Sequence, residues 1–309
     1  HGGRKRSIPG SPAGGNGLIN CHFHDHRSSD GRESLERHCE AAARSGIRHV
    51  CVTNHAEVMG EDGSWSADFE EMRERFHQVQ VSVSECREMF PDLEVRLGIE
   101  LEFRPEWTDA FDRLTAEVPF DFVLGSVHIV DGFNISGGPD KDRFFEGRSQ
   151  EAAYGRYFRE LDEMLAWGGF DVVSHFDLVK RFGHGHYGDY EPEQFRPTIQ
   201  PVLETMADRG IGIEINTSGV FGPGTPYPAR RILEWAREAG VPALTIGTDS
   251  HEPEVFAHGL PDGIELAERA GWSELTVYEG RQPALQVPVA EAMTWARDRS
   301  GSRSGEDRA

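Results

Sequence analysis

The residues of this chain that are best suited to chemistry are histidines and acids at the ends of short apolar runs. In the segment TIGTDSHEPE, an apolar run leads directly into Asp249 and His251, and both side chains are costly to bury without a partner. In CHFHDHRSSDG, His22 and His24 are two residues apart, so an extended strand places both imidazoles on one face. Imidazole and carboxylate groups in such positions are typical ligands of divalent metal ions. These two segments therefore predict a metal centre.

The same residue types recur where other apolar runs end. His55 ends VTNH, Glu100 lies in GIELEF, and His128 and His175 end GSVH and VSH. A single histidine at a strand end is usually an ordinary hydrogen-bonded residue, but six of the seven predicted strands carry such a group. Independent placement explains this recurrence poorly. The candidate metal ligands are His22, His24, Glu100, His128, His175, Asp249 and His251, with Asp30 and His55 extending the set.

This donor set is too large for one tetrahedral ion. Two or three ions that share a bridging carboxylate fit better, and the mixture of nitrogen and oxygen favours zinc, manganese or iron over magnesium alone. Clustered acids and imidazoles without cations would suffer desolvation and mutual repulsion of the acids, whereas divalent cations compensate both. The sequence does not distinguish between these metals.

Seven short apolar runs alternate with longer segments of helical periodicity, such as 33–46, 153–169 and 228–240, which end in glycine. The alternation predicts a parallel sheet, and seven units without a break favour a closed or nearly closed α/β barrel over an open doubly wound sheet. In a barrel the C-terminal ends of all strands meet at one mouth, which would bring the candidate ligands together. The predicted strands are 18–23, 47–53, 95–101, 121–127, 171–175, 211–216 and 243–248.

The domain organisation follows from the same pattern. We expect a disordered leader at 1–17, a single barrel domain at 18–290, and the end of a C-terminal helix with a solvated tail at 291–309. Insertions at 57–70 and 129–147 follow the second and fourth strands and resemble loops. Because both would open onto the mouth of the barrel, they are candidate lids or substrate walls.

Composition limits the classes of partner. The formal net charge of −21 disfavours a protein that grips long nucleic acid through its phosphates. No stretch approaches the roughly 18 apolar residues of a membrane span, and four scattered cysteines do not form a disulfide framework. We expect a soluble, cytoplasmic protein, while the sequence does not indicate its oligomeric state.

The remaining histidines are expected to play other roles. His26 is a weaker candidate for metal contact, because its spacing does not decide which way its side chain points. His184 and His186 are expected in a glycine-rich loop that forms a substrate wall or faces solvent. The histidines expected to be ordinary surface residues are His38, His49, His77 and His258.

Eight motifs occur in one order along the chain, namely HFH, SSDG, TNH, GIELEF, GSVH, SHFDLVKRFG, IEINTSG and TDSH. Together they resemble the polymerase and histidinol phosphatase (PHP) superfamily over roughly residues 18–260, and especially its stand-alone histidinol-phosphatase branch. The resemblance implies a distorted seven-stranded barrel that holds three metal ions at the C-terminal ends of its strands.

The resemblance also implies a distribution of the ligands. The first ion would take His22, His24, Glu100 and Asp249, the second would share Glu100 and add His128 and His175, and the third would use Asp30, His55 and His251. Some relatives have histidine at the position of Asp30, so the resemblance leaves His26 as an alternative to Asp30 in the third site. The second residue of TNH is often Asp in the family, so Asn54 is expected to alter the surroundings of His55 without abolishing metal binding.

The chemistry implied is hydrolysis of a phosphate monoester, most specifically L-histidinol phosphate, by a hydroxide that bridges the cations. Candidates for a direct catalytic role are the ligands Glu100, Asp249 and His251. Arg181 and then Arg230 are candidates to grip the phosphate. The sequence does not assign the group that protonates the leaving alcohol: Asp177 and Glu57 lie near the right strand ends, and both could equally support the ligands instead.

Three alternatives compete with this interpretation. The first is a PHP-type phosphoesterase acting on nucleotides or other small phosphoesters. The second is a metal-dependent amidohydrolase, but such barrels often use a bridging lysine, and none of Lys5, Lys141 and Lys180 ends a strand. The third is a degenerate barrel that only binds a partner, which the complete ligand set argues against.

Overall fold

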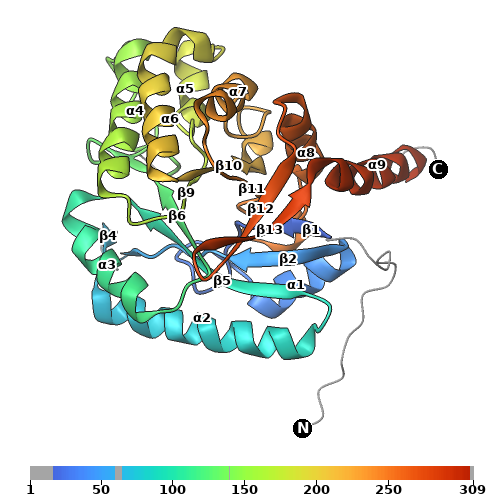
Figure 1. Ribbon diagram of the computed structural model, residues 1–309. Coiled ribbons are helices and arrows are strands. Elements are labelled where there is room, and N and C mark those ends of the chain that lie inside the picture. Colours follow the sequence, from blue (N-terminus) through green and yellow to red (C-terminus); the bar gives the residue numbers. More distant parts are fainter. Residues whose placement is uncertain (1–16, 60–64, 139, 307–309) are drawn as a thin grey trace.

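Seven parallel strands form the central sheet, and their order in space is their order along the chain (Figure 1). The computed structural model describes residues 17–59, 65–138 and 140–306. The strands of the sheet are β1 (Leu18–Asn20), β2 (Ile47–Val52), β5 (Glu94–Glu102), β6 (Phe122–Ser126), β9 (Val172–Val173), β10 (Gly212–Asn216) and β11 (Leu244–Gly247).

Backbone contacts between the first and last strands nearly close this sheet into a barrel. The amide of Cys21 donates to the carbonyl of Ile246 at 2.9 Å, and the amide of His24 donates to that of Ser250 at 2.9 Å. Sequential strand order and this closure exclude the open doubly wound alternative, in which the strand order reverses. The predicted seven-stranded α/β barrel is confirmed.

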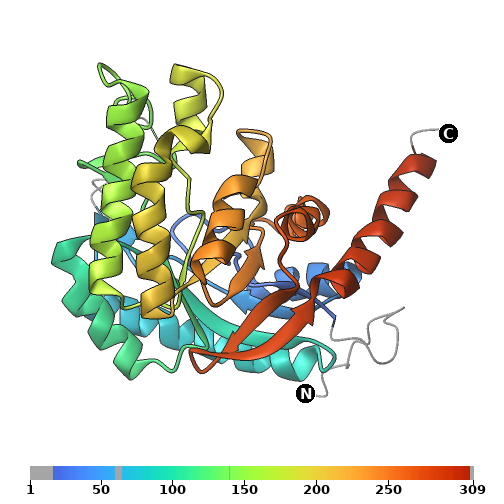
Figure 2. The ribbon, with the colours of Figure 1, turned by 45° about the horizontal axis from the view of Figure 1, so that its top comes forward.

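Helices cover the outside of the barrel, as Figures 1 and 2 show from two directions. Their ends follow common capping rules, since the side chain of Ser34 caps α1 and glycines in the left-handed conformation end α4, α6 and α7. They are α1 (Leu35–Arg44), α2 (Phe69–Met89), α3 (Thr108–Glu117), α4 (Gln150–Trp167), α5 (Lys180–Tyr187), α6 (Arg196–Arg209), α7 (Arg230–Ala239) and α8 (Leu260–Arg269).

Short 3₁₀ helices connect several of these elements. They are η1 (Pro105–Trp107), η2 (Pro192–Phe195), η3 (Thr217–Phe221) and η4 (Pro253–Val255). Within the described residues, no helix is long and apolar enough to cross a membrane.

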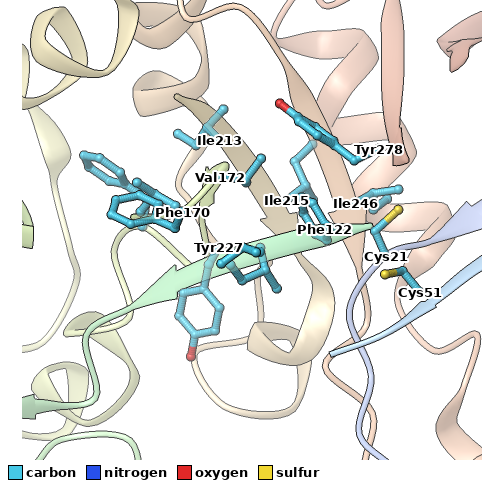
Figure 3. Packing of buried hydrophobic residues seen from close by; sticks show 14 of the residues in the cluster. Cys21, Cys51, Phe122, Phe170, Val172, Ile213, Ile215, Tyr227, Ile246 and Tyr278 are labelled. Atoms are coloured by element: carbon cyan, nitrogen blue, oxygen red, sulfur yellow. The ribbon is translucent and has the colours of Figure 1, made fainter. Parts of the chain in front are cut away.

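The barrel is filled by branched and aromatic side chains. Figure 3 shows Ile215 of β10 and Ile246 of β11 close to Phe122, whose ring centroid lies 5.1 Å from that of Tyr278. Parallel strands with helices outside and packed side chains inside are buried on both faces. This is why the strands read in the sequence as apolar runs in which a charged residue stands out.

Both insertions at the mouth of the barrel contain short antiparallel hairpins. β3 (Val58–Met59) pairs with β4 (Trp65–Ser66), and β7 (Ile129–Val130) pairs with β8 (Phe133–Asn134). Parts of the two insertions, 60–64 and 139, lie outside the described residues.

One loop prediction was wrong. Residues 180–187 form the helix α5, although the segment contains two glycines. A Cβ on Gly183 would lie 2.4 Å from the hydroxyl oxygen of Tyr154, so glycine permits close packing between α5 and α4 here. The glycine pattern alone predicts a loop, because it does not show this contact.

The chain continues beyond the barrel sheet. β12 (Glu274–Glu279) and β13 (Gln282–Pro288) form a separate antiparallel hairpin, and α9 (Val289–Glu306) follows it. Figures 1 and 2 show α9 extending away from the barrel. The helix thus occupies most of the segment expected to be a helix end and tail, while the predicted leader falls almost wholly outside the described residues.

Candidate metal centre

The C-terminal ends of the strands bring the candidate ligands together at one mouth of the barrel. Glu100 of β5 lies at the centre, and its side chain is only 1% exposed. Its Oε2 atom lies 3.2 Å from Nε2 of His22, 3.4 Å from Nε2 of His24 and 3.3 Å from Nδ1 of His55. Its Oε1 atom lies 3.0 Å from Nε2 of His175 and 3.6 Å from Nε2 of His128. One carboxylate therefore contacts ligands from four other strand ends.

Donor atoms gather in three overlapping groups, in each of which all atoms lie within 4.8 Å of one another. One group contains His22, His24 and Asp249, a second contains His55, Glu100 and His128, and a third contains His24, Asp30, His55 and His251. Each group shares two or more members with one of the three ligand sets implied by the family resemblance. All nine predicted ligands thus lie at this centre, with His175 joined to it through Glu100.

The contacts between imidazoles fit a cation better than a hydrogen-bond network. Nε2 of His22 lies 3.2 Å from Nε2 of His24, and Nε2 of His128 lies 3.0 Å from Nε2 of His175. Two imidazole nitrogens face each other in each pair, and buried polar atoms require a partner. Nitrogen and carboxylate donors in this arrangement suit a divalent metal of the zinc, manganese or iron type.

The charges of the centre depend on one another. Burial alone would raise the pKa of Glu100, but His22 and His55 hold it well below the usual range. Burial opposes charge on His55, but Glu100 and Glu57 outweigh it and raise the pKa of that imidazole. Burial and the neighbouring His251 lower the pKa of His24 to about 4. His24 therefore keeps a free lone pair for a metal at neutral pH.

The structure places Asp30, and not His26, at the third group. Oδ2 of Asp30 lies 2.9 Å from Nε2 of His251 and 3.5 Å from Nε2 of His55. His26 is exposed, and its backbone amide donates to the carbonyl of Glu33 at 2.8 Å. Geometry therefore favours Asp30 among the two alternatives.

Two buried glutamates at the centre, Glu102 and Glu214, are not among the predicted site residues. Oε2 of Glu102 lies 2.8 Å from Nδ1 of His128, and Oε1 of Glu214 lies 2.7 Å from Nδ1 of His22. Each glutamate thus contacts Nδ1 of its histidine, while Nε2 of the same ring faces the other candidate ligands. Glu102 is two residues from Glu100, so strand periodicity alone would have placed it on the same face.

Asn54, where the family often has Asp, engages Asp25. Its Oδ1 atom accepts from the amide of Asp25 at 2.8 Å, and its Nδ2 atom donates to Oδ1 of Asp25 at 2.7 Å. The pair holds the turn after β1, while Nδ1 of His55 lies 3.2 Å from Glu57. Asn54 therefore supports the turn after β1, and among the described residues its side chain makes no hydrogen bond to the ring of His55.

A cavity of about 360 Å³ opens over the centre. Its lining includes Asp30, His55, His128, Asp249 and His251, together with Arg181, Glu57, Trp65, Asn134 and Ser136. The hairpins β3–β4 and β7–β8 contribute to this wall, as expected for the two insertions.

The two predicted phosphate-binding arginines lie at different cavities. Arg181 lines the cavity over the metal centre. Arg230 lines a second cavity of about 580 Å³, and its guanidinium pairs with Glu234 at 3.0 Å. The ranking of Arg181 before Arg230 agrees with this placement, and Arg230 is not brought to the candidate ligands.

The two candidate proton donors also differ in position. Glu57 lines the cavity over the centre and is almost fully buried. Asp177 instead pairs with Lys180 at 3.2 Å and accepts from the backbone amide of Ala229 at 2.9 Å. Asp177 therefore ties the loop after β9 to the start of α7, and of these two candidates Glu57 is the one that lines the cavity.

Two predictions of surface histidines were wrong. His38 is fully buried, and its ring stacks on Phe23 with centroids 5.4 Å apart. Its Nδ1 atom lies 3.0 Å from the carbonyl of Ser34, which satisfies one nitrogen inside the core. His49 on β2 is also buried. His77 is exposed and His258 is half-buried.

His184 and His186 lie away from the candidate ligands. Both are exposed on α5, His184 lines the second cavity, and Nε2 of His186 lies 3.1 Å from Asp142. The three lysines considered for an amidohydrolase include Lys180, which pairs with Asp177, and Lys5, which lies outside the described residues. Lys141 lies over the ring of Phe182.

A nearly closed α/β barrel with clustered histidines and carboxylates at the C-terminal ends of its strands defines a metal-binding barrel of the hydrolase type. The order of the ligand motifs along the chain narrows this class further. The chain belongs to the PHP domain family, whose model matches residues 20–218.

Curated relatives cover most of the chain. A probable histidinol-phosphatase from Deinococcus radiodurans is 26% identical over 262 residues, which are 84% of this chain and 96% of the relative. A histidinol-phosphatase from Lactococcus lactis is 27% identical over 271 residues, which are 85% of this chain and 94% of the relative.

A solved structure has the same fold. The histidinol phosphate phosphatase of Lactococcus lactis, crystallised with zinc, L-histidinol and phosphate, superposes with a TM-score of 0.71 at 22% identity. The match covers 87% of this chain and 99% of that chain. The comparison confirms the barrel of the PHP type.

Proposed function

We propose that the protein is a metal-dependent phosphomonoesterase that hydrolyses L-histidinol phosphate to L-histidinol and phosphate, a reaction of histidine biosynthesis. The observation that carries the proposal is the position of Glu100 between imidazoles from four other strand ends, at distances of 3.0 to 3.6 Å. A carboxylate surrounded in this way is suited to bridge two cations. The matched relatives supply the choice of substrate.

Two or three divalent ions would be held by the nine candidate ligands. The first ion would be held by His22, His24 and Asp249, and the second by His128 and His175. Glu100 would lie between the first and second ions. The third ion would be held by Asp30, His55 and His251. Such cations supply charge that neutralises phosphoryl oxygens and lowers the pKa of water toward neutrality. Zinc, manganese and iron all suit these donors.

The residues of the chain itself bind and orient the substrate. Arg181 lines the cavity over the centre, and its planar guanidinium is suited to grip two phosphoryl oxygens at once. Glu57 and Trp65 line the same cavity and would contact the organic part of the substrate. Because no protein nucleophile is required, positioning and electrostatics provide most of the barrier reduction.

The size and charge of the cavity favour a small substrate. A volume of about 360 Å³ lies within the range of sites for small ligands. The carboxylate of Glu57 in the cavity lining suits a phosphoester with a cationic end, such as the ammonium group of histidinol phosphate. The four cysteines are buried free thiols, in agreement with the expected cytoplasmic location.

A substrate panel with metal removal tests the proposal. Phosphate release from L-histidinol phosphate, a nucleoside monophosphate and phenyl phosphate should be measured on the purified protein, after chelation, and after reloading with zinc, manganese or iron. We expect the fastest turnover on histidinol phosphate, loss after chelation and recovery after reloading. Equal turnover of the three esters would refute the substrate assignment, and unchanged turnover after complete metal removal would refute the mechanism.

A further inference from the structure

β10 is the one strand of the barrel sheet from which the sequence predicts no metal ligand. Its residues Glu214 and Asn216 are two apart and fully buried, so strand periodicity turns both toward the same side. Both side chains contact candidate ligands that belong to other strands. The role of this pair is separate from metal binding itself.

Glu214 contacts two candidate ligands with its two oxygens. Oε1 lies 2.7 Å from Nδ1 of His22, and Oε2 accepts from the backbone amide of His175 at 3.0 Å. His175 has a φ of 22°, a conformation that residues other than glycine rarely adopt. The carboxylate thus fixes a ring on one side and an unusual backbone position on the other.

The contact with His22 determines which ring nitrogen faces the metal centre. A carboxylate accepts hydrogen bonds, so Nδ1 of His22 carries the proton in this pair. The lone pair of a neutral His22 is then on Nε2, which lies 3.2 Å from both Glu100 and His24. Histidines that bind metals commonly donate their second ring N–H to a carboxylate in this manner.

Asn216 holds the carboxylate of Asp249 by a hydrogen bond. Its Nδ2 atom donates to Oδ2 of Asp249 at 3.2 Å, while its Oδ1 atom accepts from the amide of Ser218 at 3.0 Å. The other oxygen of Asp249, Oδ1, is left 3.1 Å from Nε2 of His24. The amide therefore orients the carboxylate toward the candidate ligands.

The backbone beside β10 leaves room for this arrangement. Gly247 of β11 pairs in register with Asn216. A Cβ on Gly247 would lie 2.2 Å from Cβ of His22 and 2.8 Å from Oε1 of Glu214. Glycine is thus required where His22 and Glu214 meet, because any larger residue would separate them.

We propose that β10 is a positioning strand for the metal centre, in which Glu214 fixes the tautomer of His22 and the backbone of His175 while Asn216 orients Asp249. The proposal rests on the metal centre of the proposed function, but it does not depend on which phosphoester is the substrate. Removal of a carboxylate behind a metal-bound histidine typically weakens metal binding about 10- to 100-fold.

The test compares Glu214→Gln with Glu204→Gln, a matched change at an exposed glutamate of α6. Zinc affinity is measured without substrate by competition with a chromophoric chelator. We expect Glu214→Gln to bind the most weakly held zinc about 10- to 100-fold less tightly, and Glu204→Gln to match the wild type. Wild-type affinity in a folded Glu214→Gln variant would overturn the proposal.

A second measurement does not depend on the folding of a variant. In the ¹⁵N-labelled, zinc-loaded wild-type protein, imidazole NMR correlations reveal which nitrogen of His22 carries a proton. We expect the proton on Nδ1, and a proton on Nε2 would overturn the proposal. Because neither measurement uses histidinol phosphate, the positioning role can fail while that ester is hydrolysed, and it can hold when the ester is no substrate.

Discussion

Replacement of Glu100 by Gln gives the most demanding mutational test of the centre. The side chain keeps its size, so packing around this buried position changes little. It loses its negative charge, and one oxygen becomes an amide nitrogen that cannot bind a metal. The change therefore acts on the bridging carboxylate and on little else.

The structure gives the size of the expected effect. The carboxylate oxygens lie 3.0 Å from His175 and 3.6 Å from His128. These rings are neutral when they bind a metal, so the charge of Glu100 acts on the ion that they hold. Two unit charges about 3 to 4 Å apart interact by about 5 kcal/mol at an effective dielectric constant of about 20. If relaxation recovers half of that energy, the remaining loss of about 2.5 kcal/mol corresponds to roughly 70-fold weaker binding of each ion that Glu100 contacts.

The assay is zinc content after dialysis against a chelator of graded strength, followed by phosphate release from histidinol phosphate. Glu100→Gln should lose at least one ion at chelator concentrations that leave the wild type loaded, and its turnover should fall in parallel. The reasoning would be refuted by a folded variant with the metal content and turnover of the wild type. Loss of turnover with full metal content would place Glu100 in a different role.

Three further outcomes follow from the site. Arg181→Met should raise KM for histidinol phosphate about tenfold, because a charge-assisted hydrogen bond contributes roughly 1.5 to 3 kcal/mol. Arg230→Met should leave KM within about twofold of the wild type. Equal effects of the two variants in steady-state kinetics would contradict the assignment of the two arginines to different cavities. Glu57→Gln should raise KM for histidinol phosphate, which carries an ammonium group, more than for phenyl phosphate, and a uniform rise would remove Glu57 from substrate recognition. Metal affinity should fall as the pH falls through neutrality. Burial opposes charge on His128 and His251, but Glu102 outweighs burial at His128 and Asp30 outweighs it at His251, so both pKa values are raised. These imidazoles therefore bind protons, and cease to bind metal, at a higher pH than free histidine. Calorimetric titration with zinc in two buffers of different ionisation enthalpy measures the proton release, and its absence would contradict this prediction.

The barrel and the gathering of the candidate ligands were predictable because both follow strong patterns. Parallel strands buried on both faces read as apolar runs, and a histidine or acid at the end of such a run stands out, as His128 and Asp249 do. The C-terminal ends of the strands then meet at one mouth because the sheet closes into a barrel. Asp30 was harder to assign because it lies in an irregular turn, where spacing does not set direction.

Other features depend on contacts that a single sequence does not encode in its spacing. His38 is polar, yet the helical period puts it on the inner face of α1 beside Cys39, where it stacks on Phe23. The glycines of α5 looked like loop residues, but Gly183 serves close packing against Tyr154. Glu214 is a charged residue inside the apolar run IEIN, but its partner His22 is 192 residues away, so spacing does not predict their contact.

Anomalous diffraction from crystals grown with zinc tests the central claim most directly. The account predicts two or three anomalous peaks at the C-terminal ends of the strands, with Glu100 between two of them and Asp249, His175 and His251 among the coordinating residues. Data that show these side chains clustered as here, with no anomalous peak among them at saturating zinc, would contradict the claim that shared cations bring the strand ends together.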